Sequence, residues 1–260
     1  MNIFIAPFVN ALFGFYYLTH NLGWAIIIVT ILIRLILLPL VMPSLKSAEK
    51  MRLLQPKLRK LKEKFKGDKN GMAKAQMELY KVEGINPLSG CLPQILQIAI
   101  LIIFFSAFNM VTLFSEGKGN LDNINNQLIT NFKIDDGFKF DTSFMGSSLI
   151  QVPSKTFKEN GMSPLMILPI FLLVGSGVLQ YFSAKLMMPA PKTDEAVVQK
   201  ETADKEDDMM AAMRTQSMYV MPLMTIFLGW NFSLGLLLYW FINSVTMIGQ
   251  QMVMTKLNKK

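Results

Sequence analysis

The sequence predicts an all-α polytopic membrane protein with five transmembrane helices and a helical hairpin in the cytoplasm. Of the 260 residues, 52% are hydrophobic and only 17% are charged, against roughly 25% charged in a soluble domain. Residues 84–115, 160–184 and 215–255 contain no charged side chain, and residues 22–43 contain one, Arg34. A bilayer core takes about 20 mainly apolar residues per helix. This pattern excludes a disordered chain, a disulfide scaffold and a small soluble enzyme.

The N-terminal segment, which precedes the first span, contains no basic residue other than one histidine. Residues 1–21 contain no Lys or Arg, so they lack the positive region of a signal peptide. We expect them to form an apolar or interfacial helix that stays on the protein. Residues 22–43 are predicted to form the first transmembrane helix, closed by Pro39 and Pro43.

The remaining spans follow from the uncharged segments. The second transmembrane helix is predicted within residues 86–114 and the third within residues 162–187. Residues 214–255 are too long for one helix, because at about 1.5 Å per residue they would reach about 60 Å. We expect them to fold back as a fourth and a fifth helix, with the turn at residues 229–233, where Gly, Asn and Ser interrupt the apolar pattern.

The basic residues give the predicted orientation. Residues 44–85 hold twelve lysines and arginines, whereas residues 115–161 hold five. The positive-inside rule therefore places residues 44–85 in the cytoplasm, residues 115–161 and the N-terminus outside, and the C-terminal residues 256–260 inside. The loop of residues 188–213, which mixes acids and bases, is then cytoplasmic as well.

The basic segment of residues 44–85 has the pattern of a helical hairpin. Its apolar side chains recur at helical spacing at Leu54, Leu58, Leu61 and Phe65. Residues 67–71 are predicted to form the turn and residues 72–82 the return helix. Such a hairpin can lie on anionic lipid, contact ribosomal RNA or shield an entrance. Its candidate contact residues are Lys57, Arg59, Lys60, Lys62 and Lys64.

Arg34 is the residue from which a function can be argued. Burying its charge within a span costs from about 2.5 to more than 10 kcal/mol, so the side chain should face protein or water, unless it snorkels to the cytoplasmic headgroups. Thr30 lies one turn earlier on the same face. Polar side chains that could line a hydrophilic hollow with it are Gln94, Gln97, Gln180, Tyr239, Trp240 and Asn243. For each Gln or Asn, an interhelical hydrogen bond is the alternative.

The sequence offers little for catalysis. One cysteine and one histidine supply neither a Cys/His metal site nor a histidine-based dyad, and no Gly-rich phosphate loop occurs. The predicted spans hold no carboxylate, which argues against a proton-coupled transporter. We therefore expect no enzyme, no cofactor and no metal. An anion channel or transporter that uses Arg34 as its selectivity charge stays an alternative.

Several motifs occur in a fixed order along the chain. They are residues 21–30 (NLGWAIIIVT) running on to Arg34 and residues 39–40 (PL), residues 55–58 (QPKL) with 66–69 (KGDK), residues 86–94 (NPLSGCLPQ), and residues 235–240 (GLLLYW) with Asn243 and residues 250–251 (QQ). In these motifs the sequence resembles the YidC family of membrane protein insertases, and the likeness covers all five spans.

The resemblance implies a five-helix core around a hydrophilic groove that is open to the cytoplasm and to lipid and closed outside. The hairpin would cover the mouth of this groove. Carried over position by position, Arg34 would be the groove arginine and Thr30 its neighbour. Gln180 would line the groove and Trp240 would face the substrate helix.

The resemblance also implies a function and its partners. The protein would act as an insertase and chaperone that moves hydrophobic segments of new proteins into the bilayer without nucleotide hydrolysis. Its partners would be nascent membrane proteins and the lipid bilayer, with the ribosome and the Sec translocon as further candidates. We expect a monomer in the bacterial cell membrane.

Overall fold

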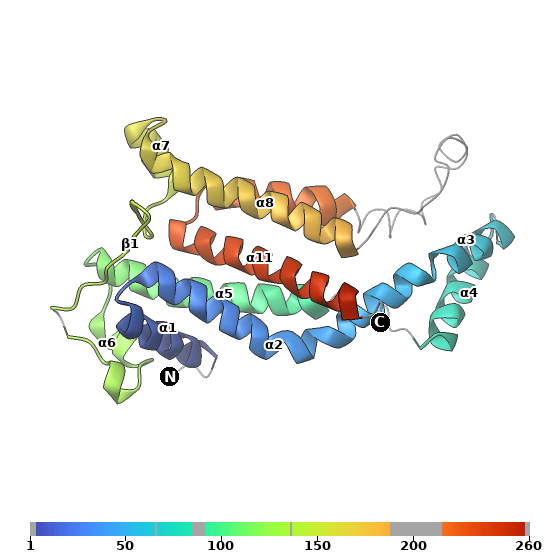
Figure 1. The fold of residues 1–260 in the computed structure, drawn as a ribbon, viewed down its shortest axis with the longest axis horizontal. Helices are drawn as coiled ribbons and strands as arrows, with labels where there is room; N and C mark the ends of the chain where they lie inside the picture. The colour runs from blue at the N-terminus through green and yellow to red at the C-terminus, as the bar shows by residue number, and fades with distance from the viewer. Residues whose placement is uncertain (1–3, 66, 85–91, 136, 188–214, 258–260) are drawn as a thin grey trace.

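Four long helices form the body of the molecule and lie side by side along its long axis (Figure 1). The structure is a computed structural model that describes residues 4–65, 67–84, 92–135, 137–187 and 215–257. The four helices are α2 (Leu22–Leu53), α5 (Leu92–Ser115), α8 (Ile167–Met187) and α11 (Leu234–Leu257). Helix α11 packs against α8 on one side and α2 on the other, and α5 contacts both α2 and α11. The predicted loop of residues 188–213 and residues 86–91 of the predicted motif lie outside the described residues.

Helix α1 (Ile5–Thr19) belongs to this packing, because one of its faces is buried against α2 and α5. The ring of Phe13 meets that of Phe140 edge to face, with 5.2 Å between centroids. The helix ends at His20, whose φ of 52° is left-handed. The side chain of Asn21 then caps the start of α2 by accepting from the backbone N–H of Gly23 at 3.0 Å. This short connection sets α1 against α2.

Helix α2 does not end at its prolines and instead continues to Leu53. Its apolar window, Leu22–Ser44, agrees with the first predicted span. Each proline removes one N–H from the helix ladder, and Pro39 removes the partner of the carbonyl four residues earlier. In the same turn, the side chain of Gln250 donates to the backbone oxygen of Arg34 at 3.0 Å. Hydrogen bonds from neighbouring helices are one reason why proline is tolerated in membrane helices.

The basic hairpin consists of α3 (Gln55–Lys64) and α4 (Lys69–Val82), which project beyond one end of the bundle (Figure 1). Asp68 caps α4 by accepting from the N–H of Gly71 at 2.9 Å, so the return helix begins before the predicted residue 72.

The apolar stripe of the hairpin packs inside it. Leu54 and Leu58 are buried together with Tyr80 of α4, and Leu79 packs against this small core. The predicted stripe is therefore confirmed for these leucines, and its partner is the returning helix.

The segment of residues 116–166, between α5 and α8, covers the opposite end of the bundle (Figure 1), and we call it the outer cap after its predicted place outside the membrane. Its elements are α6 (Leu121–Asn125), η2 (Thr130–Phe132), β1 (Ser143–Phe144), β2 (Ser147–Ser148), α7 (Pro153–Asn160) and η3 (Pro164–Met166). Strands β1 and β2 form a two-stranded antiparallel pair in which Phe144 lies opposite Ser147.

Backbone hydrogen bonds tie the outer cap to the helix starts. The N–H of Leu22, at the start of α2, donates to the oxygen of Asp141 at 3.3 Å. At the start of α11, the N–H of Leu234 donates to the oxygen of Gln151 at 2.8 Å. Helix starts expose N–H groups without a partner in their own helix, and the outer cap supplies acceptors for them.

The fourth predicted span is short in the described part of the chain. A five-residue π-helical segment, η4 (Gln216–Val220), runs into the nine-residue α10 (Met221–Gly229), which packs against α8. Helix α11 begins at Leu234, so the turn lies where the Gly, Asn and Ser residues predict it.

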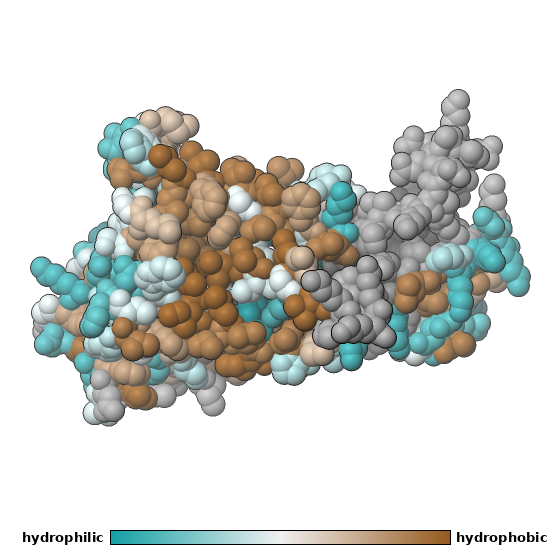
Figure 2. Space-filling view, viewed as in Figure 1, coloured by the Kyte–Doolittle hydropathy of each residue, from teal (hydrophilic) through white to brown (hydrophobic). Residues whose placement is uncertain are grey.

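Large apolar side chains cover the outside of the bundle. Ile36, Leu40, Ile102, Phe171 and Phe227 are among the exposed ones. Figure 2 shows a hydrophobic band over the middle of the molecule, between more hydrophilic ends. By length and composition, three helices in the described residues could cross a membrane, Leu22–Ser44, Ile95–Ser115 and Pro164–Leu186. A contiguous apolar surface of this kind is typical of contact with lipid.

Candidate functional site around Arg34

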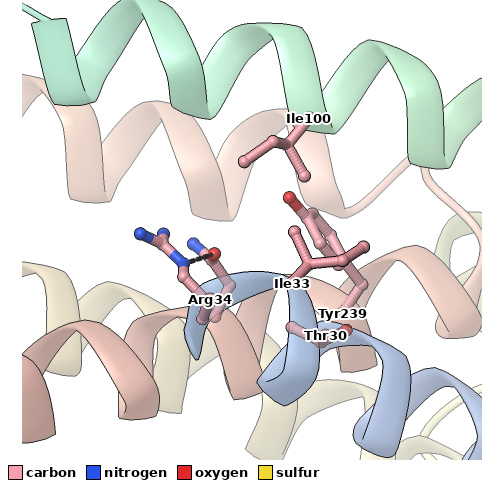
Figure 3. A pocket seen from close by; sticks show the side chains of 6 residues that line it. Thr30, Ile33, Arg34, Ile100 and Tyr239 are labelled. Atoms are coloured by element: carbon pink, nitrogen blue, oxygen red, sulfur yellow. Dashed lines mark hydrogen bonds between the residues drawn. The ribbon is translucent and has the colours of Figure 1, made fainter. Parts of the chain in front are cut away.

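Arg34 lies between three helices, near the middle of the apolar window of α2. Together with residues of α5 and α11 it lines a small hollow inside the bundle (Figure 3). The lining residues are Thr30, Ile33, Arg34, Ile100, Tyr239 and Asn243. A small hydrophilic patch also interrupts the hydrophobic band of the surface (Figure 2). The structure therefore places the charged side chain of the first span against protein.

Amide side chains hold the guanidinium group. Its Nε donates to Oδ1 of Asn243 at 2.6 Å, and its Nη2 donates to Oε1 of Gln97. The Nε2 of Gln97 donates in turn to the hydroxyl oxygen of Tyr239 at 3.4 Å. Asn243 and Tyr239 are one helical turn apart on α11, and Gln97 comes from α5. One network thus joins α2, α5 and α11 through the arginine.

The ring of Tyr239 fixes one wall of the hollow. It is 1% exposed and stacks on Phe104 of α5, with 4.2 Å between ring centroids. Its phenol end lies beside Ile100 (Figure 3). The apolar contact sets the position of α5 and α11 and leaves the hydroxyl for the network.

The network contains no counterion for Arg34. Residues 1–48, 84–115, 160–193 and 209–260 of the sequence include no Asp or Glu. Both acceptors that face the guanidinium are neutral amide oxygens, which stabilise a cation by hydrogen bonds without neutralising it. The site is therefore a partly buried arginine that two amide oxygens hold in place without neutralising its charge.

The structure brings together most of the side chains predicted for the hollow. Arg34, Thr30, Tyr239 and Asn243 line it, and Gln97 joins it by its hydrogen bonds. The hydroxyl of Thr30 donates to the backbone oxygen of Ile26 at 2.6 Å, so it turns back to its own helix.

Two predicted groove residues have other partners. The Oε1 of Gln180 accepts from the hydroxyl of Thr225 at 2.9 Å, which links α8 to α10. The indole of Trp240 is partly buried and lies 6.1 Å from the ring of Phe232, measured between centroids. Neither side chain lines the hollow around Arg34.

Sequence reasoning missed three participants of the site. Ile33 and Ile100 line the hollow, and no signal in the sequence separates them from the many other isoleucines. Gln250, which bonds the backbone of Arg34, lies seven residues after Asn243. Since residues seven apart share a helix face, this spacing could have placed it near the arginine.

The candidate contact residues of the hairpin lie on its surface where the structure describes them. Lys57 forms an ion pair with Glu83, with 2.5 Å between Nζ and Oε1. The Nζ of Lys64 lies 5.8 Å from the centre of the Phe65 ring, and Lys60 is exposed. The side chains of Arg59 and Lys62 are outside the described part of the chain.

The comparisons with known proteins give a consistent family. A family model described as "60Kd inner membrane protein" matches residues 14–260. The chain is 32% identical over 251 residues to a protein of Pelobacter propionicus, and the match covers 96% of this chain and 38% of the relative. It is 31% identical over 250 residues to a protein of Geotalea daltonii, and this match covers 96% of the chain and 37% of the relative. It is 32% identical over 253 residues to a protein of Granulibacter bethesdensis, and this match covers 97% of the chain and 38% of the relative. Each relative is named membrane protein insertase YidC. The chain thus spans less than two fifths of the length of these relatives.

Proposed function

The chain belongs to the 60Kd inner membrane protein family, and from this membership we propose that it is a membrane protein insertase of a bacterial inner membrane. It moves hydrophobic segments of newly made proteins from the cytoplasmic side into the lipid bilayer. The names of its relatives support this reading, and they lend no support to an anion channel. In this proposal the chain crosses the membrane five times, with α3 and α4 in the cytoplasm and the outer cap outside.

The observation that carries the mechanism is the arginine held by neutral amides in an apolar span. Moving the polar tail of a client protein into hydrocarbon is costly, because its groups lose their hydrogen bonds with water. The network around Arg34 offers polar partners at that depth and a positive charge for an acidic tail. The apolar helix of the client then leaves sideways into lipid, and no step requires nucleotide hydrolysis.

Further partners and the groove residues are part of the same proposal. Nascent membrane proteins are the substrates, and the bilayer is the partner that receives them. The ribosome and the Sec translocon are further candidate partners. The protein works as a monomer. Gln180 and Trp240 contact the client farther along the groove. The exposed lysines of the hairpin, Lys57, Lys60 and Lys64, contact lipid or ribosomal RNA at its mouth.

The experiment that tests this function uses the purified chain in liposomes without nucleotide. Two single-span clients differ only in a short tail, which carries two aspartates in the acidic-tail client and two asparagines in the neutral-tail client. Protease protection measures how much of each client inserts. We expect insertion of both clients well above that in empty liposomes.

The substitution Arg34→Ala tests the role of the charge. We expect about a tenfold loss for the acidic-tail client and a change of less than about threefold for the neutral-tail client, since a charge-assisted hydrogen bond is worth about 1.5–3 kcal/mol. Lys139→Ala removes a charge of the same sign from the outer cap and should leave both values unchanged. Equal loss of both clients with Arg34→Ala would contradict the electrostatic part of the mechanism.

A further inference from the structure

The hydrogen bonds of Arg34 distinguish two edges of its guanidinium group. A guanidinium presents its donors as a fork, with Nε and Nη2 on the side edge and Nη1 and Nη2 on the end edge. Asn243 accepts from Nε and Gln97 accepts from Nη2, so the side edge is occupied by amide oxygens. Among the described residues, Nη1 has no hydrogen-bond partner. In Figure 3 the terminal nitrogens of Arg34 point away from Ile33 and Tyr239.

Asn243 is held firmly enough to set the direction of this group. It is 5% exposed, and its Oδ1 accepts from Nε at 2.6 Å. The hydroxyl of Thr246 donates to its backbone oxygen at 2.9 Å, within the same helix. An acceptor fixed on the Nε side leaves the end edge as the direction from which a carboxylate can bind with two parallel hydrogen bonds.

The charge of the residue at position 243 matters as much as its shape. Asparagine and aspartate have nearly the same size, and an aspartate would form an ion pair with Arg34 inside the bundle. Such an ion pair would neutralise the arginine, and a second carboxylate beside the first would be repelled by its like charge. The neutral amide orients the guanidinium and keeps its charge available.

We propose that Asn243 is a positioning residue that directs the end edge of Arg34 toward a carboxylate of the client and, by being neutral, sets the preference for acidic tails. This inference rests on the proposed insertase function and names the part of the client that the site binds. The carboxylate binds Nη1 and the second N–H of Nη2, so the bonds of the side edge to Asn243 and Gln97 stay in place.

The test is Asn243→Asp in the liposome assay with the acidic-tail and neutral-tail clients. We expect insertion of the acidic-tail client to fall about tenfold relative to the neutral-tail client, whose insertion stays within about twofold of the unchanged protein. Asn243→Gln retains a neutral amide, so this variant should keep at least part of the preference for the acidic-tail client. A structural role alone would lower both clients together, so a loss shared equally by the two clients overturns the inference.

Gln251→Glu is the matched control, because it introduces the same charge on the same helix. The Nε2 of Gln251 donates to the hydroxyl of Ser183 at 2.7 Å, on the side of α8. This variant should change the insertion of the two clients by the same factor.

If Asn243→Asp does not fold, Asn243→Ala removes the acceptor of Nε without adding charge. It should reduce the preference for the acidic-tail client about threefold. An unchanged preference overturns the inference.

The outcomes also separate this inference from the proposed function. An unchanged protein that inserts neither client above the level of empty liposomes contradicts the insertase function itself. If the unchanged protein inserts both clients and Asn243→Asp inserts them in the same ratio, only the role of Asn243 is contradicted.

Discussion

At the scale of residues, the stability of the site depends on how a buried charge is compensated. An arginine at the centre of a membrane helix costs about 2.5–3.5 kcal/mol by insertion measurements. A hydrogen bond to a charged group contributes about 1.5–3 kcal/mol, and Arg34 has two of them, to Gln97 and Asn243. The two bonds are of the same size as the cost, so the bundle can hold the arginine without a carboxylate.

Gln97→Leu tests this balance, because leucine keeps the volume of the side chain and removes the acceptor of Nη2. We expect the apparent free energy of unfolding in detergent micelles to fall by about 1–3 kcal/mol. Ser106→Ala is the control on the same helix, since its hydroxyl donates only to the backbone oxygen of Ile102 on the exposed face. It should stay within about 0.5 kcal/mol of the unchanged protein. Equal unfolding midpoints for the two variants would show that the amide of Gln97 contributes nothing.

The sequence predicts residues of the site from the energetic cost of a charge in an apolar span and from helical spacing. It cannot identify residues to which neither argument applies. A charge in an apolar span identifies Arg34, and one helical turn leads to Thr30. Helix α11 is apolar on most of its circumference, so no pattern indicates which side faces α2. Tyr239 and Trp240 are therefore equal candidates by sequence, and only the packing of Tyr239 on Phe104 shows which one lines the hollow.

At the scale of elements, the sequence predicts where helices occur better than where they end. Two prolines suggest an end for the first span, yet α2 continues for ten residues beyond Pro43 to Leu53. The helix continues although each proline removes one N–H, and the side chain of Gln250 on α11 bonds the backbone oxygen of Arg34 in the same turn. This contact comes from a residue distant in the sequence, so a local pattern cannot predict it.

Close contact between α5 and α11 yields a prediction at this scale. A Cβ atom added at Gly235 would lie 2.2 Å from the ring of Phe108, which the packed ring cannot easily avoid. We therefore expect Gly235→Ala to lower the unfolding midpoint in detergent clearly, with a cost of about 1–3 kcal/mol for overpacking. Gly249→Ala is the matched control on α11, where an added Cβ meets no atom within 4 Å.

The control has its own expected sign. Alanine is the better helix former by about 1 kcal/mol, so Gly249→Ala should be neutral or slightly stabilising. A Gly235→Ala protein as stable as the Gly249→Ala protein would mean that the two helices separate easily at this contact.

At the scale of the whole molecule, composition and family resemblance predict an α-helical membrane protein, and the comparisons confirm the family. For residues 115–161 the sequence predicts only a place outside the membrane and no elements, because the short elements of the outer cap have no repeating pattern. Hydrogen bonds hold the outer cap to α1 and to the starts of α2 and α11. The orientation of the molecule in the membrane stays a prediction from its basic residues.

Labelling from one side of the membrane tests that orientation. Cysteine is introduced by Lys60→Cys in α3 or by Lys139→Cys in the outer cap, in each case together with Cys91→Ser. A membrane-impermeant maleimide should label the Lys139→Cys protein in intact spheroplasts and the Lys60→Cys protein only after the membrane is opened. The reverse pattern would invert the topology and place the hairpin outside.

The backbone bonds of the outer cap have a consequence for how the bundle can move. They join the starts of α2 and α11 to the same segment at one end of the molecule, whereas farther along side chains join the two helices, from Arg34 to Asn243 and from Gln250 to the backbone oxygen of Arg34. Separation of α2 from α11 beside Arg34 therefore requires these side-chain bonds to break, while the backbone bonds at the outer cap can stay in place.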